Sequence, residues 1–358
     1  MPSLKEIKGR INSISSTLAI TSAMKMVAAA KLQKAQMAIQ NMLPYERRLH
    51  SMLIDLMGAM NISAAASEDG SVRGSGSAER GFDQSGDRLS LSNRHDLAGM
   101  DGAYSLMAQR EVRKVAIVAF ASNSSLCGAF NSNAIREATA VINEYRASGL
   151  GDADITVYSV GRKMAEAMKK LGFPSPADFT KMSDSPSYDA ASALAQELFD
   201  GFVSGRFDKV ELVYNHYKST SSQPTTRQTY LPLSLADATA DIQVGKITDS
   251  ASESDTNRGA ESVGAPVVRQ GSPTTEDLIV EPSKEELIVT LLPKVVRLRV
   301  FTTLLDSTAA EQAARTVAMQ LATDNGNDLL QELTLEYNKG RQQKITSEIL
   351  DLVGGSMQ

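Results

Sequence analysis

Few residues in this sequence could perform chemistry on a substrate, and their spacing does not assemble a known site. The one cysteine, Cys127 in SNSSLCGAFN, could be a nucleophile as its thiolate, but no recognised motif pairs it with a histidine. We expect instead a small buried thiol near a strand-to-helix turn. The histidines His50, His95 and His216 lie too far apart in the sequence to show metal-site spacing. For His216, which falls in a predicted strand, a hydrogen-bonded structural role is favoured over a ligand role.

Phosphate-binding patterns are also missing from the sequence. It contains no G-x-x-x-x-G-K-[ST] loop. The closely spaced glycines Gly74, Gly76 and Gly81 lie in a Ser- and Asp-rich stretch rather than between a strand and a helix, which argues against a dinucleotide site. The sequence therefore predicts no cofactor, no metal and no catalytic site on this chain.

Residues 1–60 predict one long helix that needs a partner. Apolar residues recur every three or four positions, a mean repeat near 3.5 that is typical of a coiled-coil seam. The seam residues are Leu4, Ile7, Ile11, Ile14, Leu18, Met24, Val27 or Ala28, Leu32, Ala35, Ile39, Met42, Leu49, Met52, Leu56 and Met60. Such a helix is about 85 Å long, more than a small domain can cover, and Pro44 should bend it or interrupt it locally.

The middle of the chain predicts a Rossmann-like open α/β domain over residues 111–282. Strand-like runs such as VRKVAIVAFA and DITVYSV alternate with amphipathic helices such as SNAIREATAVINEYRAS, a pattern that favours a mainly parallel sheet. DKVELVYNHYKS, TTRQTYLPL and DLIVEP supply further predicted strands. Two polar, Gly- and Ser-rich stretches, 61–110 and 234–275, are predicted to be flexible insertions.

Residues 283–358 predict a second long helix, which starts at a capping box of Ser283 and Glu286 and is kinked by Pro293. Its apolar seam is Leu287, Leu291, Val295, Leu298, Leu305, Ala309, Ala313, Val317, Leu321, Leu329, Leu333, Tyr337, Ile345, Ile349 and Leu352. We expect the two terminal helices to pair as a long antiparallel coiled coil, so that they project as a stalk from the α/β domain.

Composition and charge narrow the class of partner. The chain has 358 residues, only 5% aromatics and a net charge of -5, so nothing global favours nucleic acid. No run of about 18 apolar residues exists, which predicts no direct membrane insertion. The first 60 residues are nevertheless basic: Lys25, Lys31 and Lys34 form either a solvated face or a surface that meets acidic partners. Met24, Met26, Met37 and Met42 are either core filler or an adaptable surface that tolerates sliding.

Long motifs at both ends resemble the ATP synthase gamma subunit family. They are ITSAMKMVAAAKLQKAQ at 20–36 and AEQAARTVAMQLATDNGNDLLQELTLEYNKGRQQKITSEILDLVGG at 310–355. SLKEIKGRI, SSLCGAFNSN and VEPSKEELIVTLLPKVV extend the similarity over all but the two insertions.

The resemblance implies a central rotor shaft that couples proton translocation to ATP synthesis and hydrolysis on beta subunits. It implies as partners the alpha and beta subunits of the catalytic hexamer, an epsilon subunit and the membrane c-ring, at the cytoplasmic face of the bacterial inner membrane. The beta-subunit contacts that it implies, with Lys25 added from the basic face above, are Met24, Lys25, Arg315, Arg341, Gln342 and Thr346.

The sequence departs from the family pattern at several points. Leu18 and Ala19 replace basic residues, the turn Ser122–Gly128 lacks the usual acid–base pair, and Gly340 stands where alanine is usual. An alternative of another class is a static coiled-coil scaffold that carries an α/β interaction module. A Rossmann-like enzyme with helical arms is disfavoured, because the phosphate motif is missing.

Overall fold

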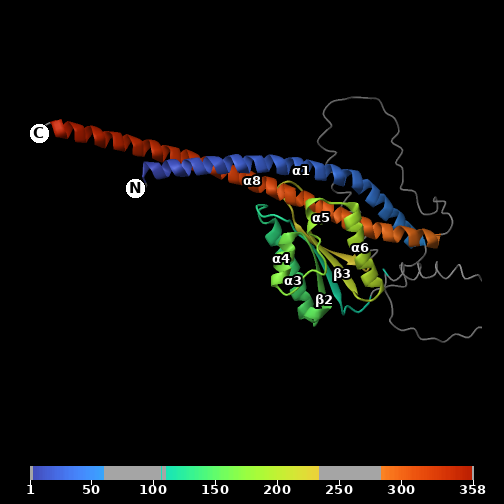
Figure 1. Ribbon diagram of the computed structural model, residues 1–358. Coiled ribbons are helices and arrows are strands. Elements are labelled where there is room, and N and C mark those ends of the chain that lie inside the picture. The colour runs from blue at the N-terminus through green and yellow to red at the C-terminus, as the bar shows by residue number, and fades with distance from the viewer. Residues whose placement is uncertain (1–2, 60–105, 107–109, 234–283, 357–358) are drawn as a thin grey trace, which may run out of the picture.

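The structure is a two-helix stalk with an α/β domain beside it (Figure 1). This computed structural model describes residues 3–59, 106, 110–233 and 284–356. Helix α1 (Leu4–Ala59) and helix α8 (Lys284–Ser356) confirm the two long terminal helices. Both helices continue through their prolines, Pro44 and Pro293, so neither proline interrupts its helix. Nearly all of the insertion 61–110, the insertion 234–275, the strand DLIVEP and Ser283 of the capping box lie outside the described residues.

The stalk is an antiparallel coiled coil, as predicted, and Figure 1 shows α1 and α8 side by side with N and C at the same end. Contacts between the helices define the register. As residue numbers rise along α1, the numbers of their partners on α8 fall. The pairs are Leu4 with Gly340, Leu18 with Gly326, Thr21 with Thr323, Lys25 with Gln320 and Glu46 with Thr302.

The predicted seam of α1 is confirmed where it meets α8. Ile7, Leu32 and Leu49 are buried, and of the two seam candidates Val27 and Ala28, Ala28 is 1% exposed whereas Val27 is 57% exposed. Ala28 therefore faces the partner helix, and Val27 faces outward.

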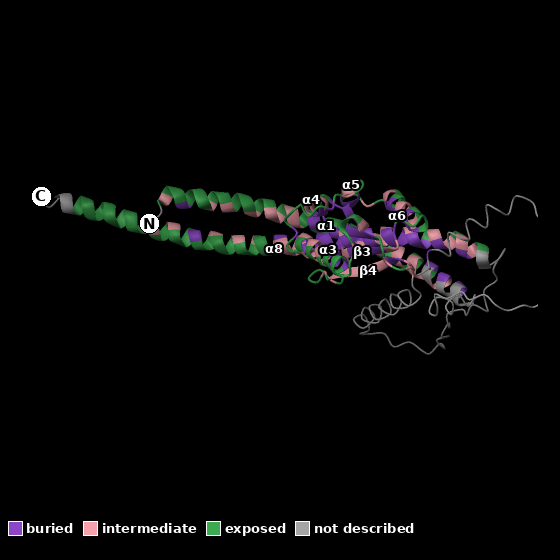
Figure 2. Cartoon of the chain, turned by 90° about the horizontal axis from the view of Figure 1, so that it is seen from below, coloured by how far each residue is buried: buried purple, intermediate pink, exposed green. Residues whose placement is uncertain are grey.

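The predicted seam of α8 is wrong beyond Gly340. Because α1 begins at Leu4, opposite Gly340, this helix does not extend alongside the end of α8. Residues 341–353 are all exposed, including Ile345 and Ile349, so the end of α8 is a single helix that overhangs α1 (Figure 2). Leu321 and Leu329, also assigned to the seam, are 58% and 45% exposed.

The α/β domain is built on a four-stranded sheet in the order β2-β1-β3-β4. Strand β1 pairs in parallel with β2 and β3, and β4 pairs antiparallel with β3 at the edge. The sheet is therefore mainly parallel, as predicted. The strands are β1 (Val115–Phe120), β2 (Ile155–Val160), β3 (Lys209–Asn215) and β4 (Thr225–Leu231).

Helices cover both faces of this sheet. They are α3 (Phe130–Ala147), α4 (Arg162–Lys170), α5 (Thr180–Asp184) and α6 (Tyr188–Val203), with a short 3-10 turn, η2 (Asp152–Asp154). The five-residue α5 has no counterpart among the predicted elements.

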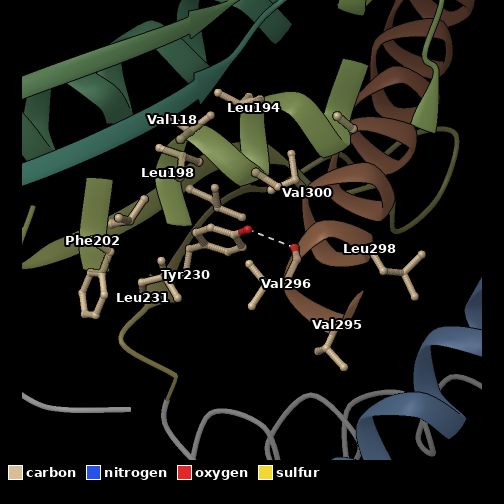
Figure 3. Packing of buried hydrophobic residues seen from close by; sticks show 14 of the residues in the cluster. Val118, Leu194, Leu198, Phe202, Tyr230, Leu231, Val295, Val296, Leu298 and Val300 are labelled. Carbon is tan, nitrogen blue, oxygen red and sulfur yellow. Dashed lines mark hydrogen bonds between the residues drawn. The ribbon is translucent and has the colours of Figure 1, made fainter. Parts of the chain in front are cut away.

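Alternate residues of the central strand β1 serve two separate cores. Ile117 and its neighbours on the same face pack with α3 and α4. Val118 and its neighbours on the other face pack with α6 and with the first half of α8. In that second core the buried Tyr230 of β4 donates a hydrogen bond of 2.9 Å to the main-chain oxygen of Val296 in α8 (Figure 3). The stalk is therefore part of the domain's own hydrophobic core.

A buried ionic cluster joins β3, β4 and α3. Glu211 is 1% exposed, and its carboxylate accepts hydrogen bonds from Tyr145 Oη at 2.6 Å and Arg227 Nε at 2.7 Å, with Lys209 Nζ also at 2.7 Å. Burial, the largest single influence, would raise the pKa of Glu211, but together the donors, Arg227 first, hold that pKa below its usual value. The cluster therefore keeps a charge inside the domain.

Candidate functional site

The exposed end of α8 carries three of the predicted contact residues. Arg341, Gln342 and Thr346 are all exposed on the overhang beyond α1. Gln342 and Thr346 are one turn apart, and Thr346 Oγ1 donates to the Gln342 main-chain oxygen at 2.9 Å. Of the three, the Arg341 guanidinium and the Gln342 amide offer side-chain donors in a planar arrangement that suits recognition of a carboxylate or a carbonyl group.

Two further predicted contact residues lie lower on the stalk, on α1. Met24 and Lys25 are half-buried, and Lys25 Nζ donates to Gln320 Oε1 of α8. The Lys25 ammonium thus ties the two helices together. Lys31 and Lys34 are exposed and keep their charges on the surface.

Arg315 lies apart from the other predicted contact residues, at the joint between α8 and the α/β domain. Its side chain is 9% exposed. Nη1 donates to the Ser125 main-chain oxygen at 2.6 Å, and Nη2 donates to Ser124 Oγ at 2.8 Å and to Glu311 Oε1 at 2.7 Å. Burial raises the pKa of Glu311, an effect that the Arg315 charge opposes. Arg315 is therefore engaged within the chain, and its contact with a beta subunit stays a prediction.

The turn that receives Arg315 also holds the cysteine. Cys127 is 1% exposed, and Asn131 Nδ2 lies 3.2 Å from its sulfur atom. Because Cys127 lies between β1 and α3, the structure confirms a small buried thiol at a strand-to-helix turn. Leu126 before it has φ of 68°, a left-handed conformation that costs a non-glycine residue about 1 kcal/mol.

His216 forms a second polar contact between the α/β domain and α8. Its Nδ1 lies 2.6 Å from Asp306 Oδ2, and the Tyr217 main-chain N–H donates to Asp306 Oδ1 at 2.9 Å. The hydrogen bond with Asp306 is the main reason why the pKa of His216 is raised. This confirms the structural role favoured for His216.

The comparisons with known proteins cover the chain almost from end to end. The ATP synthase family model matches residues 3–357. A gamma chain of ATP synthase from Phocaeicola vulgatus is 47% identical over 357 residues and covers 100% of both chains. The chain belongs to the ATP synthase gamma-chain family. The Bacteroides thetaiotaomicron gamma chain, 45% identical over 358 residues, agrees with this assignment.

One solved structure shares the fold of the chain over nearly its whole length. A chain in the mitochondrial ATP synthase of Euglena gracilis (OSCP/F1/c-ring, rotational state 3) superposes with a TM-score of 0.52 at 18% identity. The match covers 99% of this chain and 93% of that one, so the likeness of fold extends over the paired terminal helices and the α/β domain.

Two further kinds of feature, a metal-binding cluster and a membrane-spanning helix, are absent from the described residues of this gamma-chain fold. Over residues 3–59, 110–233 and 284–356, no group of three or more His, Cys, Asp and Glu side chains is placed to hold a metal ion. None of the helices in these ranges is both long and apolar enough to cross a membrane.

Asp306 is the functional candidate that sequence reasoning missed. It is the one charged residue in the stretch VFTTLLDSTAA of α8, at 300–310. A single carboxylate in an otherwise uncharged helical stretch needs a partner when it is buried, so this charge was the available signal. The partner itself, 90 residues earlier in the chain, could not be read from the sequence.

Proposed function

We propose that this chain is the central rotor shaft of an ATP synthase, carries no catalytic site of its own, and couples proton translocation to ATP synthesis or hydrolysis by turning. The observation that carries the proposal is the shape of the stalk. Two helices run antiparallel past an α/β domain that lies to one side, and one of them overhangs the other. A long, asymmetric axle with a single-helix tip suits insertion into a surrounding ring of subunits.

The asymmetry supplies the mechanism. The stalk presents a different face to each of the surrounding beta subunits, so each contact favours a different beta conformation. A partner can shift such an equilibrium only by its differential affinity for the two states. Rotation of the stalk changes which beta subunit gains that affinity, so the beta subunits pass through the same conformations one after another.

The parts of the chain are proposed to meet different partners. The stalk and tip contact the alpha and beta subunits, with Met24, Lys25, Arg315, Arg341, Gln342 and Thr346 as candidate beta contacts. The α/β domain binds an epsilon subunit and rests on the membrane c-ring. In this proposal the chain is a peripheral subunit at the cytoplasmic face of the bacterial inner membrane.

The tip contacts can be tested by replacing Arg341 and Gln342 together with alanine. Arginine contacts at the centre of an interface are commonly worth about 2 kcal/mol or more, so we expect at least about tenfold weaker assembly or coupled synthesis. The α/β domain should stay folded, because both side chains are exposed. A matched control replaces the neighbouring exposed Gln343 and Lys344 with alanine. Near-normal coupled ATP synthesis in the first variant would refute the proposed role.

A static scaffold with an α/β interaction module is the competing function. The two differ in one observable, rotation of a bead fixed to the α/β domain while the catalytic subunits are immobilised and supplied with ATP. Stepwise rotation supports the shaft. A firmly assembled complex whose bead never turns supports the scaffold.

A further inference from the structure

We infer that Asp306 and Arg315 are positioning residues that lock the α/β domain to α8, so that α8 rather than α1 carries torque between the domain and the tip. The lock is a property of the joint alone, whereas its role in torque rests on the proposed function.

The α/β domain holds α8 far more extensively than α1. Helices α3, α5 and α6 and strand β3 all pack against α8. Among the described residues, α1 makes its extensive contacts with α8 and much sparser ones with the elements of the domain. One hydrogen bond that does link α1 to the domain runs from Gln36 Nε2 to Tyr217 Oη at 2.6 Å. A twist applied to the domain therefore enters α8 first.

Between Asp306 and Arg315 the contact of α8 with the domain is smooth, whereas the preceding turns of α8, with Leu292, Val296 and Val300, pack into the domain core. Ala310 of α8 packs with Cys127 and Phe130 of the domain, and Ala314 lies against the same cluster. Alanine side chains provide close approach but no projections that interlock with the opposite surface. Apolar contact is also non-directional, so this surface alone gives little resistance to α8 rolling on the domain.

Polar contacts brace the joint on its two flanks. Asp306 and Arg315 are nine positions apart, about two and a half turns, so their side chains leave α8 on nearly opposite sides. Ala310 and Ala314 point between these two directions. A roll in either sense therefore stretches one of the two contacts. The nine positions also separate the contacts by about 14 Å along the axis, which resists tilting.

Both contacts are well formed. The two Asp306 oxygens each have a partner, His216 Nδ1 and the Tyr217 main-chain N–H. The Arg315 guanidinium is held at one end by Glu311 and reaches Ser124 and Ser125 with the rest of its donors. Charge-assisted hydrogen bonds depend on direction and are stronger than neutral ones, so they fix an orientation that apolar packing leaves loose.

The joint can be tested on the free full-length chain. Spin labels replace the exposed Lys170 of α4 and Gln331 of α8 in a Cys127→Ser background, and pulsed electron spin resonance reports the distribution of their separation. In an Asp306→Ala/Arg315→Ala variant we expect the distribution to widen by about 1.5- to 2-fold. A matched control, Lys344→Ala/Glu348→Ala, removes one charge of each sign from an exposed pair on α8 and should leave the width unchanged.

These measurements test whether Asp306 and Arg315 lock the joint, and they do so without depending on whether the complex rotates. An unchanged width in the double variant overturns the lock. If the double variant fails to fold, Asp306→Asn and Arg315→Lys replace it, because both keep the side-chain size while weakening the directed contacts. The Asp306→Asn and Arg315→Lys substitutions should widen the distance distribution by a smaller amount. An unchanged width would overturn the inference in this case too.

The torque path is tested in the assembled complex with Asp306→Ala, since Asp306 is not a candidate beta contact. We expect protons pumped per ATP hydrolysed, measured against an opposing gradient, to fall at least twofold. Tyr217→Phe, which cuts the link from Gln36 of α1, should leave this ratio unchanged. A wider joint with normal pumping, or a loss with Tyr217→Phe alone, overturns α8 as the torque path. A wild-type complex that does not rotate refutes the proposed function and leaves the joint measurement standing.

Discussion

Replacing Glu211 with glutamine should loosen the edge of the sheet while keeping the shape of the side chain. Tyr145, Lys209 and Arg227 all donate to the two oxygens of the Glu211 carboxylate. In the glutamine variant one of these oxygens becomes an NH₂ group, which is itself a donor and cannot accept their hydrogen bonds. Removing one partner of a buried ionic group costs about 3–5 kcal/mol. Lys209 and Arg227 are about a quarter exposed, so water compensates part of the loss, and we expect about 2–3 kcal/mol.

Hydrogen exchange of β4 amides is the appropriate assay, because the chain has no tryptophan to report on this domain by fluorescence. A loss of 2–3 kcal/mol corresponds to exchange roughly 30- to 150-fold faster. The matched control is Glu144→Gln, which removes a carboxylate paired with the same Arg227 but 64% exposed. Exposed pairs contribute about 0–1 kcal/mol, so this variant should exchange almost as slowly as the wild type.

The pH dependence gives a second, independent check on Glu211. The folded chain lowers the pKa of this carboxyl group, so its contribution to stability is complete above the unfolded pKa, about 4.3. That contribution is lost as the pH falls through the lower, folded pKa. The difference between wild type and Glu211→Gln should therefore shrink below pH 4. Equal exchange rates for Glu211→Gln, Glu144→Gln and wild type at pH 7 would refute the reasoning.

Three further predictions concern the stalk and its joint. Gly326→Ala should destabilise the chain by about 1 kcal/mol, because the new Cβ would lie 2.6 Å from Leu18 Cδ2, but should become stabilising in a Leu18→Ala background, where helix propensity alone acts. Thermal unfolding followed by circular dichroism measures both, and the same sign in both backgrounds would contradict the packing. Tyr230→Phe should cost about 1 kcal/mol in denaturant unfolding, since it removes one buried hydrogen bond, and an unchanged midpoint would count against it. His216 has a raised pKa beside Asp306, so the stability that it adds is complete below about pH 6.5 and is lost as the pH rises through the folded pKa. The stability gap to His216→Gln should therefore be larger at pH 6 than at pH 9, and a gap that grows with pH would exclude this origin.

The long helices were predictable because each packs against another long helix, and that kind of packing leaves a regular apolar repeat in the sequence. Residues such as Ile7, Leu32 and Leu49 repeat with a coiled-coil period, and a periodic seam identifies both the element and the face that it buries. The same reasoning failed beyond Gly340. The apolar period of one helix does not reveal how far the partner helix extends. Here the start of α1 lies opposite Gly340, so α1 does not cover the residues of α8 beyond it.

The joint residues were less accessible to sequence reasoning. His216 and Cys127 could be assigned structural roles from their local context, but their partners are set by tertiary packing. Arg315 was assigned to a partner subunit by family resemblance, and its internal contacts with Ser124 and Ser125 depend on how a turn almost 200 residues earlier meets α8. Glu211 gave no warning at all, since a single charged residue in a strand is usually on its solvent face.

The overhanging tip has a consequence for how the protein is made and handled. Ile345, Ile349 and Leu352, which share one face of the helix, are between 44% and 75% exposed, and no described residue of α1 lies beside this part of α8. A strip of this kind promotes self-association at high concentration. If the tip is buried against partner subunits, as proposed above, production of the chain in excess over those partners should yield aggregates, and co-production should prevent them.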